Sequence, residues 1–273
     1  MHLDQGNTAF VLISSALVLL MTPGLAFFYG GMVKAKSVVS MMMLSFGSLG
    51  LIGVLWVLYG YAISFSNAGS GNFLGIDGWF GIDLNSLGLS AQVADAKDVA
   101  GAYPQLGFVA FQATFAIITV ALISGAIADR AKFGAWMVFA GLWATIVYFP
   151  VANWVFNFTL ADGKVTDGGW IVYNLGVIDF AGGTAVHINA GAAGLALAIV
   201  LGKRFGFSKG MTQPHNVPLT LLGVSLLWFG WFGFNSGSEL AADGTASLAF
   251  INTLAAPAAA MLGWIFVEKI KHG

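Results

Sequence analysis

Seven apolar stretches, each long enough to cross a lipid bilayer, constrain this sequence more than any other feature. The hydrocarbon core of a bilayer requires about 20 mainly apolar residues per helix. The stretches are Thr8–Phe28, Val38–Phe65, Leu106–Ala128, Phe133–Phe156, Phe180–Leu201, Val217–Phe234 and Ser247–Val267. We therefore predict an all-α polytopic membrane protein with seven transmembrane helices, formed as a single transmembrane domain over residues 1–273.

The composition excludes most other classes of protein. Charged residues make up 8% of the chain and hydrophobic residues 58%, whereas soluble domains are close to one quarter charged. Disordered chains are polar and poor in aromatic residues, so disorder is excluded as well. The chain has no Cys, which removes disulfides, thiolate catalysis and Cys-ligated metals. A net charge of −1 gives no footprint for nucleic acid. We predict no cofactor, no metal and no enzymatic activity.

The cationic residues predict the orientation in the membrane. Nine of the eleven Lys and Arg residues lie in alternate loops or at the C-terminus: Lys34, Lys36, Arg130, Lys132, Lys203, Arg204, Lys209, Lys269 and Lys271. The positive-inside rule assigns this side to the cytoplasm. The N-terminus is then outside, and the C-terminus is cytoplasmic. The long Asn67–Gln105 loop is external, with two interpretations: a cap or short-helix segment, or a solvated loop.

Charged groups are absent from the middle of every apolar stretch, with one titratable exception. The absence of Lys, Arg and Glu argues against a voltage sensor, a carboxylate proton pump and a Schiff-base Lys. His187 lies about midway along the fifth stretch. It has two interpretations: a packing residue bonded to a backbone carbonyl, or a functional residue, which is the default for an ionisable group inside a membrane. Asp179, which precedes two glycines, is interpreted as a helix cap.

Aromatic residues mark the outer ends of two stretches. Phe115 lies several residues inside the third stretch, and Phe234 ends an aromatic run that starts at Trp228. Taken alone, either Phe is core packing, since the chain has 23 of them. Trp231 fits an interfacial anchor. Glycines flank Phe234, and the Ser-Gly-Ser sequence at 236–238 predicts that the chain opens outward there.

Three longer motifs carry a family resemblance. Residues 22–33 (Thr-Pro-Gly-Leu-Ala-Phe-Phe-Tyr-Gly-Gly-Met-Val), residues 179–190 around His187 and residues 230–238 ending at Ser238 resemble motifs of the ammonium transporter (Amt/Mep/Rh) family, closest to its bacterial Amt branch. The match is collinear over essentially the whole chain. It implies an eleven-helix fold built from two five-helix inverted repeats. By this resemblance the chain holds the first repeat and two helices of the second, and is truncated at its C-terminus relative to the family.

The resemblance also implies roles for individual residues at the outer side. Phe115 and Phe234 resemble the paired rings that close the outer vestibule. Ser238 resembles the hydroxyl that accepts a hydrogen bond from ammonium. Phe156 aligns with the vestibule tryptophan and departs from the family, because phenylalanine is a weaker cation–π partner. The neighbouring Trp154 is a poor substitute, since residues two apart on a helix point in different directions.

Deeper in the chain, the resemblance assigns the remaining site residues. His187 resembles the first of two facing pore histidines, and the helix with the second lies outside this sequence. Asp179 resembles the acidic residue beneath the recruitment site, so it is grouped with the substrate-binding residues. Trp231 is grouped with the pore-lining residues.

The function implied is an ammonium/ammonia channel or transporter subunit for nitrogen uptake, with methylammonium as a second substrate. The family further implies a homotrimer in the bacterial inner membrane, in contact with lipid and with a cytoplasmic PII-type signal protein. Three alternatives stay open: an ammonium sensor, an intramembrane enzyme that uses His187, and a non-conducting fragment of a transporter.

Overall fold

The computed structural model describes residues 3–66, 72–76, 79–94, 98–99, 103–161, 164–204, 207 and 213–273. Lys209, one of the nine cations that predict the orientation, lies outside these residues, as does part of the Asn67–Gln105 loop. The helical elements, which include short 3₁₀ and π turns labelled η, are α1 (Gln5–Met32), η1 (Ala35–Ser37), α2 (Val38–Leu55), η2 (Trp56–Gly60), α3 (Tyr61–Ser64), η3 (Leu84–Leu89), α4 (Ser90–Ala94), α5 (Gln105–Ile123), η4 (Ser124–Ile127), α6 (Phe133–Trp143), η5 (Ala144–Tyr148), α7 (Phe149–Phe156), η6 (Trp170–Asn174), η7 (Gly183–Ile188), α8 (Asn189–Leu201), α9 (Val217–Ser236), η9 (Gly237–Glu239) and α10 (Gly244–His272). The strands are β1 (Asn72–Ile76), β2 (Phe80–Asp83), β3 (Asp98–Val99), β4 (Tyr103–Pro104), β5 (Phe158–Ala161) and β6 (Lys164–Gly168).

Seven helical segments of the described chain are long and apolar enough to cross a membrane, which confirms the predicted number of spans. They are Gln5–Met32, Ala35–Ser64, Gln105–Ile127, Phe133–Phe156, Gly183–Leu201, Val217–Glu239 and Gly244–His272. Most are longer than predicted, because capping residues extend them beyond the apolar run. Asp4 caps α1 by accepting from the amide of Asn7, and Asp243 caps α10 by accepting from the amide of Ala246.

Several predicted span ends differ from the structure, and two of the differences have a local cause. The fifth span begins at Gly183 rather than Phe180, because Gly182 has φ +107°, a left-handed conformation that interrupts the helix. The sixth span continues through Glu239, whereas the Ser-Gly-Ser sequence predicted an opening after Phe234. The hydroxyl of Ser238 donates to the carbonyl oxygen of Phe234 and so satisfies a group at this helix end.

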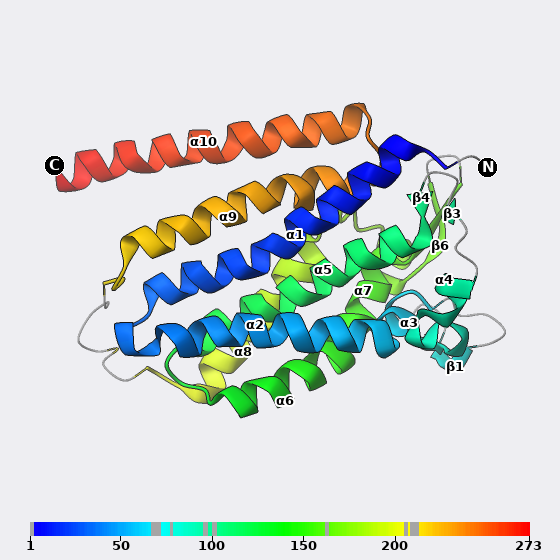
Figure 1. Cartoon of the computed structure of the whole chain (residues 1–273), viewed down its shortest axis with the longest axis horizontal. Coiled ribbons are helices and arrows are strands. Elements are labelled where there is room, and N and C mark those ends of the chain that lie inside the picture. Colours follow the sequence, from blue (N-terminus) through cyan, green and yellow to red (C-terminus); the bar gives the residue numbers. More distant parts are fainter. Residues whose placement is uncertain are drawn as a thin grey trace.

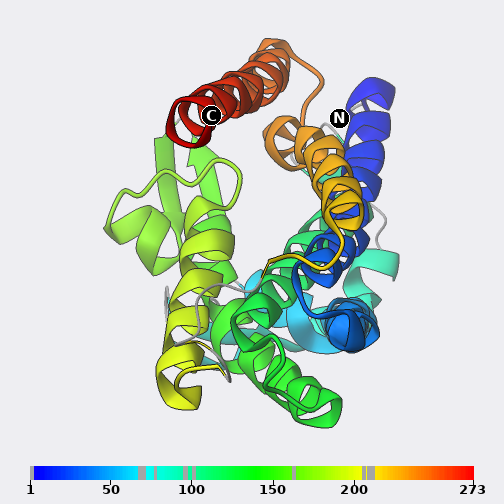
Figure 2. The ribbon, with the colours of Figure 1, turned by 90° about the vertical axis from the view of Figure 1, so that its left-hand side faces the viewer.

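The spanning helices form an arc rather than a closed ring. Viewed from one end of the bundle, the arc runs from α10 through α9, α1 and α5 to α8 (Figure 2). In the side view, the ends of α1, α8 and α10 and the start of α6 lie at one end of the molecule (Figure 1). The loops and ends at this side carry the cations Lys34, Lys36, Arg130, Lys132, Lys203, Arg204, Lys269 and Lys271.

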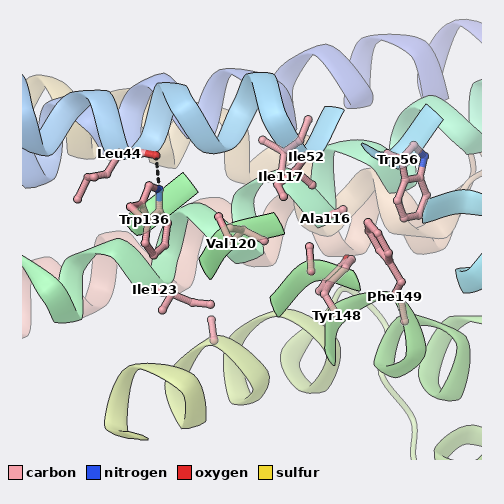
Figure 3. Packing of buried hydrophobic residues seen from close by; sticks show 14 of the residues in the cluster. Leu44, Ile52, Trp56, Ala116, Ile117, Val120, Ile123, Trp136, Tyr148 and Phe149 are labelled. Carbon is pink, nitrogen blue, oxygen red and sulfur yellow. Dashed lines mark hydrogen bonds between the residues drawn. The ribbon is translucent and has the colours of Figure 1, made fainter. Parts of the chain in front are cut away.

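A buried core joins α2, α5 and the helical segment of α6, η5 and α7 (Figure 3). Trp136 is buried on α6, and its indole N–H donates to the carbonyl oxygen of Leu44 on α2 at 2.9 Å. Trp56 donates likewise to the carbonyl oxygen of Val109 on α5 at 3.1 Å. Each indole therefore buries its ring among apolar neighbours while its one polar group is satisfied.

Helices α1 and α9 pack with their backbones in close approach. A β-carbon placed on Gly223 of α9 would lie 2.2 Å from the backbone nitrogen of Phe28 on α1, and one on Gly31 would lie 2.6 Å from the backbone nitrogen of Thr220. Gly230, Gly233 and Gly237 of the same helical segment also approach α1 too closely for a side chain. Small residues permit this approach, and close backbone packing is a main source of attraction between helices in lipid.

Short hairpins lie between some of the helices, in addition to the helical spans that the sequence predicted. Strands β1 and β2, β3 and β4, and β5 and β6 pair as three separate antiparallel hairpins. They gather at the end of the bundle opposite the cations (Figure 1). The predicted external loop between residues 67 and 105 thus includes strands as well as the short helical elements η3 and α4.

Candidate pore

Two phenylalanine rings from different helices meet face to face within the arc. Phe115 on α5 and Phe234 on α9 have ring centroids 4.5 Å apart, at an interplanar angle of 24°. Their exposed fractions are 1% and 2%, so neither ring contacts the surroundings. Phe111 packs against Phe115 with the centroids 4.8 Å apart. The stacked pair closes any path that runs between α5 and α9 at this level.

The structure also brings Phe156 to this pair. The ring of Phe156, at the end of α7, lies edge-on to Phe115 at a centroid distance of 6.3 Å. Trp154 points elsewhere, as predicted: its ring packs against Trp79 and Trp170, and its indole N–H donates to the carbonyl oxygen of Trp79. Phe156, and not Trp154, is therefore the aromatic residue of this helix that joins Phe115.

Ser238 lies one turn beyond Phe234, in η9. Its hydroxyl donates a hydrogen bond to the carbonyl oxygen of Phe234 at 2.7 Å. This bond uses the donor and leaves the oxygen lone pairs as acceptors. The side chain is half-buried. A half-buried hydroxyl that can only accept is suited to a ligand that donates hydrogen bonds.

His187 lies on the other side of Phe234, in the π turn η7. Its imidazole is edge-on to the ring of Phe234 at 5.7 Å and lies 5.6 Å from the ring of Trp231. The carbonyl oxygen of Gly182 lies 3.4 Å from Nδ1. Since a carbonyl only accepts, a neutral His187 in this contact carries its proton on Nδ1 and leaves Nε2 as an acceptor. The side chain is half-buried.

Asp179 holds the start of the helix that carries His187. One carboxylate oxygen accepts from the amides of Gly182 and Gly183 at 2.6 and 2.8 Å, and the other accepts from those of Thr184 and Ala185 at 2.8 and 3.0 Å. These are the free amides of a helix start, which attract negative charge. The carboxylate therefore acts as a cap, which is the interpretation that the sequence favoured for it.

Trp231 faces a hollow between α9 and α10. The hollow has a volume of about 850 Å³, and its walls also include Phe28 of α1, Phe180 and Asn235. Because the ring of Trp231 contacts both His187 and Phe234, it forms part of the wall between the histidine and this hollow. These contacts differ from those of an interfacial anchor, which is the role that the sequence suggested for Trp231.

Sequence reasoning missed the π turn at residues 183–188. One extra residue in a helical turn displaces the side chains that follow it, and such turns often occur at functional sites. In the sequence, the glycine at position 182 is the one available signal of an irregular turn here. Its left-handed φ is compatible with glycine, and a β-carbon there would lie 2.9 Å from Val186 and 3.4 Å from the ring of Phe234.

An arc of apolar helices with a stacked phenylalanine pair next to a histidine defines a polytopic membrane protein with a candidate solute pathway. The model of the Ammonium Transporter Family matches residues 9–273, so the chain belongs to that family. An ammonium transporter of Mycobacterium tuberculosis strain H37Rv is 57% identical over 278 residues, which cover 99% of this chain and 58% of the relative.

Solved structures agree in fold. The crystal structure of Saccharomyces cerevisiae Mep2 matches with a TM-score of 0.83 and 34% identity, covering 99% of this chain and 57% of that one. A structure described as a sensor Amt protein matches with a TM-score of 0.81 and 27% identity, covering 97% and 62%. The chain thus spans a little under two thirds of the length of the proteins it matches.

Proposed function

We propose that the chain forms the ammonium-selecting part of an ammonium/ammonia channel or transporter, in which ammonium binds outside the stacked rings, loses its proton and passes His187 as ammonia. The observation that carries this proposal is the order of side chains along α9 and η9. Ser238, Phe234 and Trp231 follow one another at intervals of about one turn, and His187 contacts the last two. Family membership supports the choice of ammonium.

The outer site would select by hydrogen bonding rather than by size. Ammonium and potassium ions are similar in size and equal in charge, but only ammonium donates hydrogen bonds. Ser238 offers an acceptor, because its own proton is engaged by Phe234. The half-buried ring of Phe156 adds cation–π attraction of roughly 0.5–2 kcal/mol. The face of Phe115 becomes available to ammonium only when the stacked ring of Phe234 moves aside. Asp179 adds negative charge at the start of the helix that carries His187, where its oxygens accept from four amides.

Beyond the rings, neutral ammonia is the favoured species. Moving an unpaired ion into hydrocarbon costs on the order of tens of kcal/mol by Born solvation, whereas a neutral amine avoids that cost. A neutral imidazole donates at one nitrogen and accepts at the other. His187 is therefore suited to stabilise ammonia, or to receive and pass on its proton.

The arrangement of helices supports a proposal about the remainder of the fold. We propose that α1 to α8 form the first five-helix repeat, that α9 and α10 are the first two helices of an inverted second repeat, and that residues 1–273 belong to one incomplete transporter domain. The length shared with the matched proteins, 58% in the mycobacterial relative, supports this division. Homotrimer formation and binding of a PII-type protein are proposed on family resemblance.

The distribution of cations supports the proposed location. We place the end of the bundle that carries Lys34, Arg130, Lys203 and Lys269 at the cytoplasmic face of the bacterial inner membrane, with the N-terminus outside. The stacked rings and Ser238 then face the exterior, from which ammonium is taken up as a nitrogen source.

Uptake of labelled methylammonium by cells that produce the protein tests the proposal. We expect saturable uptake that resists excess potassium, that is lost in His187→Ala and that is retained in His272→Ala, which removes an exposed histidine at the end of α10. Uptake that survives His187→Ala would exclude a pathway past this residue. A protein that inserts correctly and takes up no methylammonium would favour the non-conducting alternative.

A sensor is the second candidate, supported by the likeness to the sensor Amt protein. A sensor binds ammonium without moving it at a useful rate. Quenching of tryptophan fluorescence by ammonium, in a protein that gives no flux in liposomes, would favour it over a transporter.

A further inference from the structure

A buried side-chain amide on α5 has no hydrogen-bond partner in the described chain. The side chain of Gln112 is 7% exposed, and its Oε1 accepts from no described residue. None of the described residues accepts from its Nε2 either. Buried polar groups in proteins are nearly always bonded, and an unbonded one is costly. The amide therefore calls for a partner that the described residues do not supply.

The position of Gln112 is on the outer side of the stacked rings. It precedes Phe115 by three residues, a spacing that places both side chains on one face of α5. Because α5 runs from the hairpin end of the bundle to the cation-bearing end (Figure 1), Gln112 is the outer of the two. Its neighbour Phe111 approaches the start of η9, since a β-carbon on Gly237 would lie 3.1 Å from that ring. Ser238 follows in η9, so the amide and this hydroxyl belong to the same outer level of the bundle.

The aromatic surroundings explain why the chain leaves this amide unbonded. Phe111, Phe115 and Phe156 contact one another in a row, and their side chains have no polar atom. Thr114, the nearest hydroxyl along α5, already donates to the carbonyl oxygen of Phe111 at 2.6 Å. A positively charged ligand that donates hydrogen bonds matches both parts of this environment, because it bonds the amide oxygen and is attracted by aromatic faces.

We propose that Gln112 is a second hydrogen-bond acceptor for ammonium, supplied by α5 as Ser238 is supplied by η9. The inference rests on the proposed function and adds a residue to its outer site. Ammonium donates in several directions at once, so it can bond both acceptors. Potassium is held in channels by whole rings of carbonyl oxygens, which two acceptors do not form. A half turn of the amide exchanges its oxygen and nitrogen, and because no described residue bonds either atom, the oxygen can turn toward the ligand.

Thermal unfolding of the detergent-purified protein tests this role, with ammonium chloride replacing potassium chloride at constant ionic strength. Gln112→Leu removes the amide and nearly keeps the side-chain volume. Gln112→Glu keeps an acceptor oxygen, whether its carboxyl group is charged or neutral. Gln92→Leu is the matched control, because Gln92 is also buried with an unbonded Oε1 but lies in α4, outside the spanning helices.

Ammonium should raise the unfolding midpoint of the parent more than potassium does, since a ligand of the folded state stabilises it. For Gln112→Leu we expect the ammonium concentration needed for a given rise to increase by roughly tenfold, as for the loss of one hydrogen bond to a cation. Without ammonium its midpoint should equal or exceed that of the parent, because no unbonded amide remains. Gln112→Glu and Gln92→Leu should respond to ammonium at least as strongly as the parent.

An unchanged ammonium response in Gln112→Leu overturns the proposal, as does an equal loss of response in Gln92→Leu or a parent that ammonium stabilises no more than potassium. Methylammonium uptake by the same proteins separates this result from the proposed function. Uptake that His187→Ala abolishes, with the same half-saturation in Gln112→Leu as in the parent, overturns the second acceptor and leaves the proposed function standing. An ammonium response that only Gln112→Leu loses, in a protein without uptake, supports the second acceptor and contradicts conduction.

Discussion

The hydroxyl of Ser238 illustrates how a single proton determines what a side chain can bind. Because the carbonyl oxygen of Phe234 already accepts that proton, the oxygen of Ser238 keeps its lone pairs for a ligand that donates hydrogen bonds. We expect Ser238→Ala to raise the half-saturation concentration for methylammonium uptake by roughly tenfold, since losing an acceptor for a cation costs about 1.5–3 kcal/mol when the site is desolvated. The maximal rate should stay near that of the parent.

Ser247→Ala is the matched control for this measurement. Ser247 also donates to the carbonyl four residues earlier, that of Asp243, but it lies on the exposed start of α10. It should leave both uptake parameters unchanged. A Ser238→Ala protein with an unchanged half-saturation and a lowered maximal rate would contradict a recruitment role.

Asp179 permits a test of stability at the same scale. Asparagine has one carbonyl oxygen, so in Asp179→Asn at least two of the four amides lose their acceptor, at a cost of about 2 kcal/mol or more. We expect the midpoint of thermal unfolding, followed by tryptophan fluorescence, to fall by several degrees. In Asp243→Asn, where the side chain accepts from one helix amide, asparagine caps as well as aspartate and the midpoint should hold. Equal midpoints in the two variants would show that the four-amide cap contributes little.

Single residues also show where sequence reasoning ends. Phe115, Phe156, His187 and Phe234 belong to four helical segments far apart in the sequence. No spacing rule brings such residues together, and their proximity was expected only through a family resemblance. The capping role of Asp179 is different: a carboxylate a few residues before two glycines at a helix start is a local pattern, and local patterns can be recognised in a sequence.

Among the elements, two glycine-to-alanine substitutions are expected to change the stability of the protein in opposite directions. Gly223→Ala places a methyl group 2.2 Å from the backbone of Phe28, and overpacking of this kind destabilises by about 1–3 kcal/mol. Gly263→Ala lies on the open side of α10, with nothing within 4 Å, and should stabilise the helix by roughly 0.5–1 kcal/mol. Unfolding midpoints measured in one detergent distinguish the two.

Both glycines lie inside apolar helices, so helix propensity alone predicts a gain from alanine at each. A higher midpoint for Gly223→Ala would show that α1 and α9 are less closely packed than described. The opposite signs therefore test the helix contact and not the helices themselves.

Element types were predictable, whereas irregularities within elements were not. Length and apolarity identify all seven spans. The π turns at residues 56–60, 144–148, 170–174 and 183–188 have no comparable signature in length or composition. A π turn is a matter of one extra residue in the hydrogen-bond pattern, and that pattern is set by the helices that pack around it.

For the whole molecule, orientation is the property that the sequence predicts and that labelling can measure. The chain has no Cys, so single cysteines serve as probes. We expect Ala35→Cys, between α1 and α2, to react with a membrane-impermeant maleimide only after the inner membrane is opened. Thr245→Cys, exposed at the start of α10, should react in intact spheroplasts. The reverse pattern would invert the proposed topology.

The arrangement of the helices in an arc was beyond sequence reasoning. In water, the buried face of a helix is recognised because its exposed face is polar. In a bilayer both faces are apolar, since lipid and protein interior are alike in polarity. Thus α5 is largely buried and α10 almost wholly exposed, although both are strongly apolar. Composition alone gives no order of packing.

The glycines between α1 and α9 have a consequence for how such a protein can change over generations. Every amino-acid replacement that one nucleotide change can produce from a glycine codon adds atoms, and at Gly223, Gly230 or Gly233 those atoms would meet the neighbouring helix. Descendants of this chain should therefore vary little at these glycines of the α1–α9 contact. Phe234 and Trp231 lie on the same helix, α9, but the glycines are constrained by packing. Slow divergence there would record geometry, and should not be mistaken for a sign of chemistry.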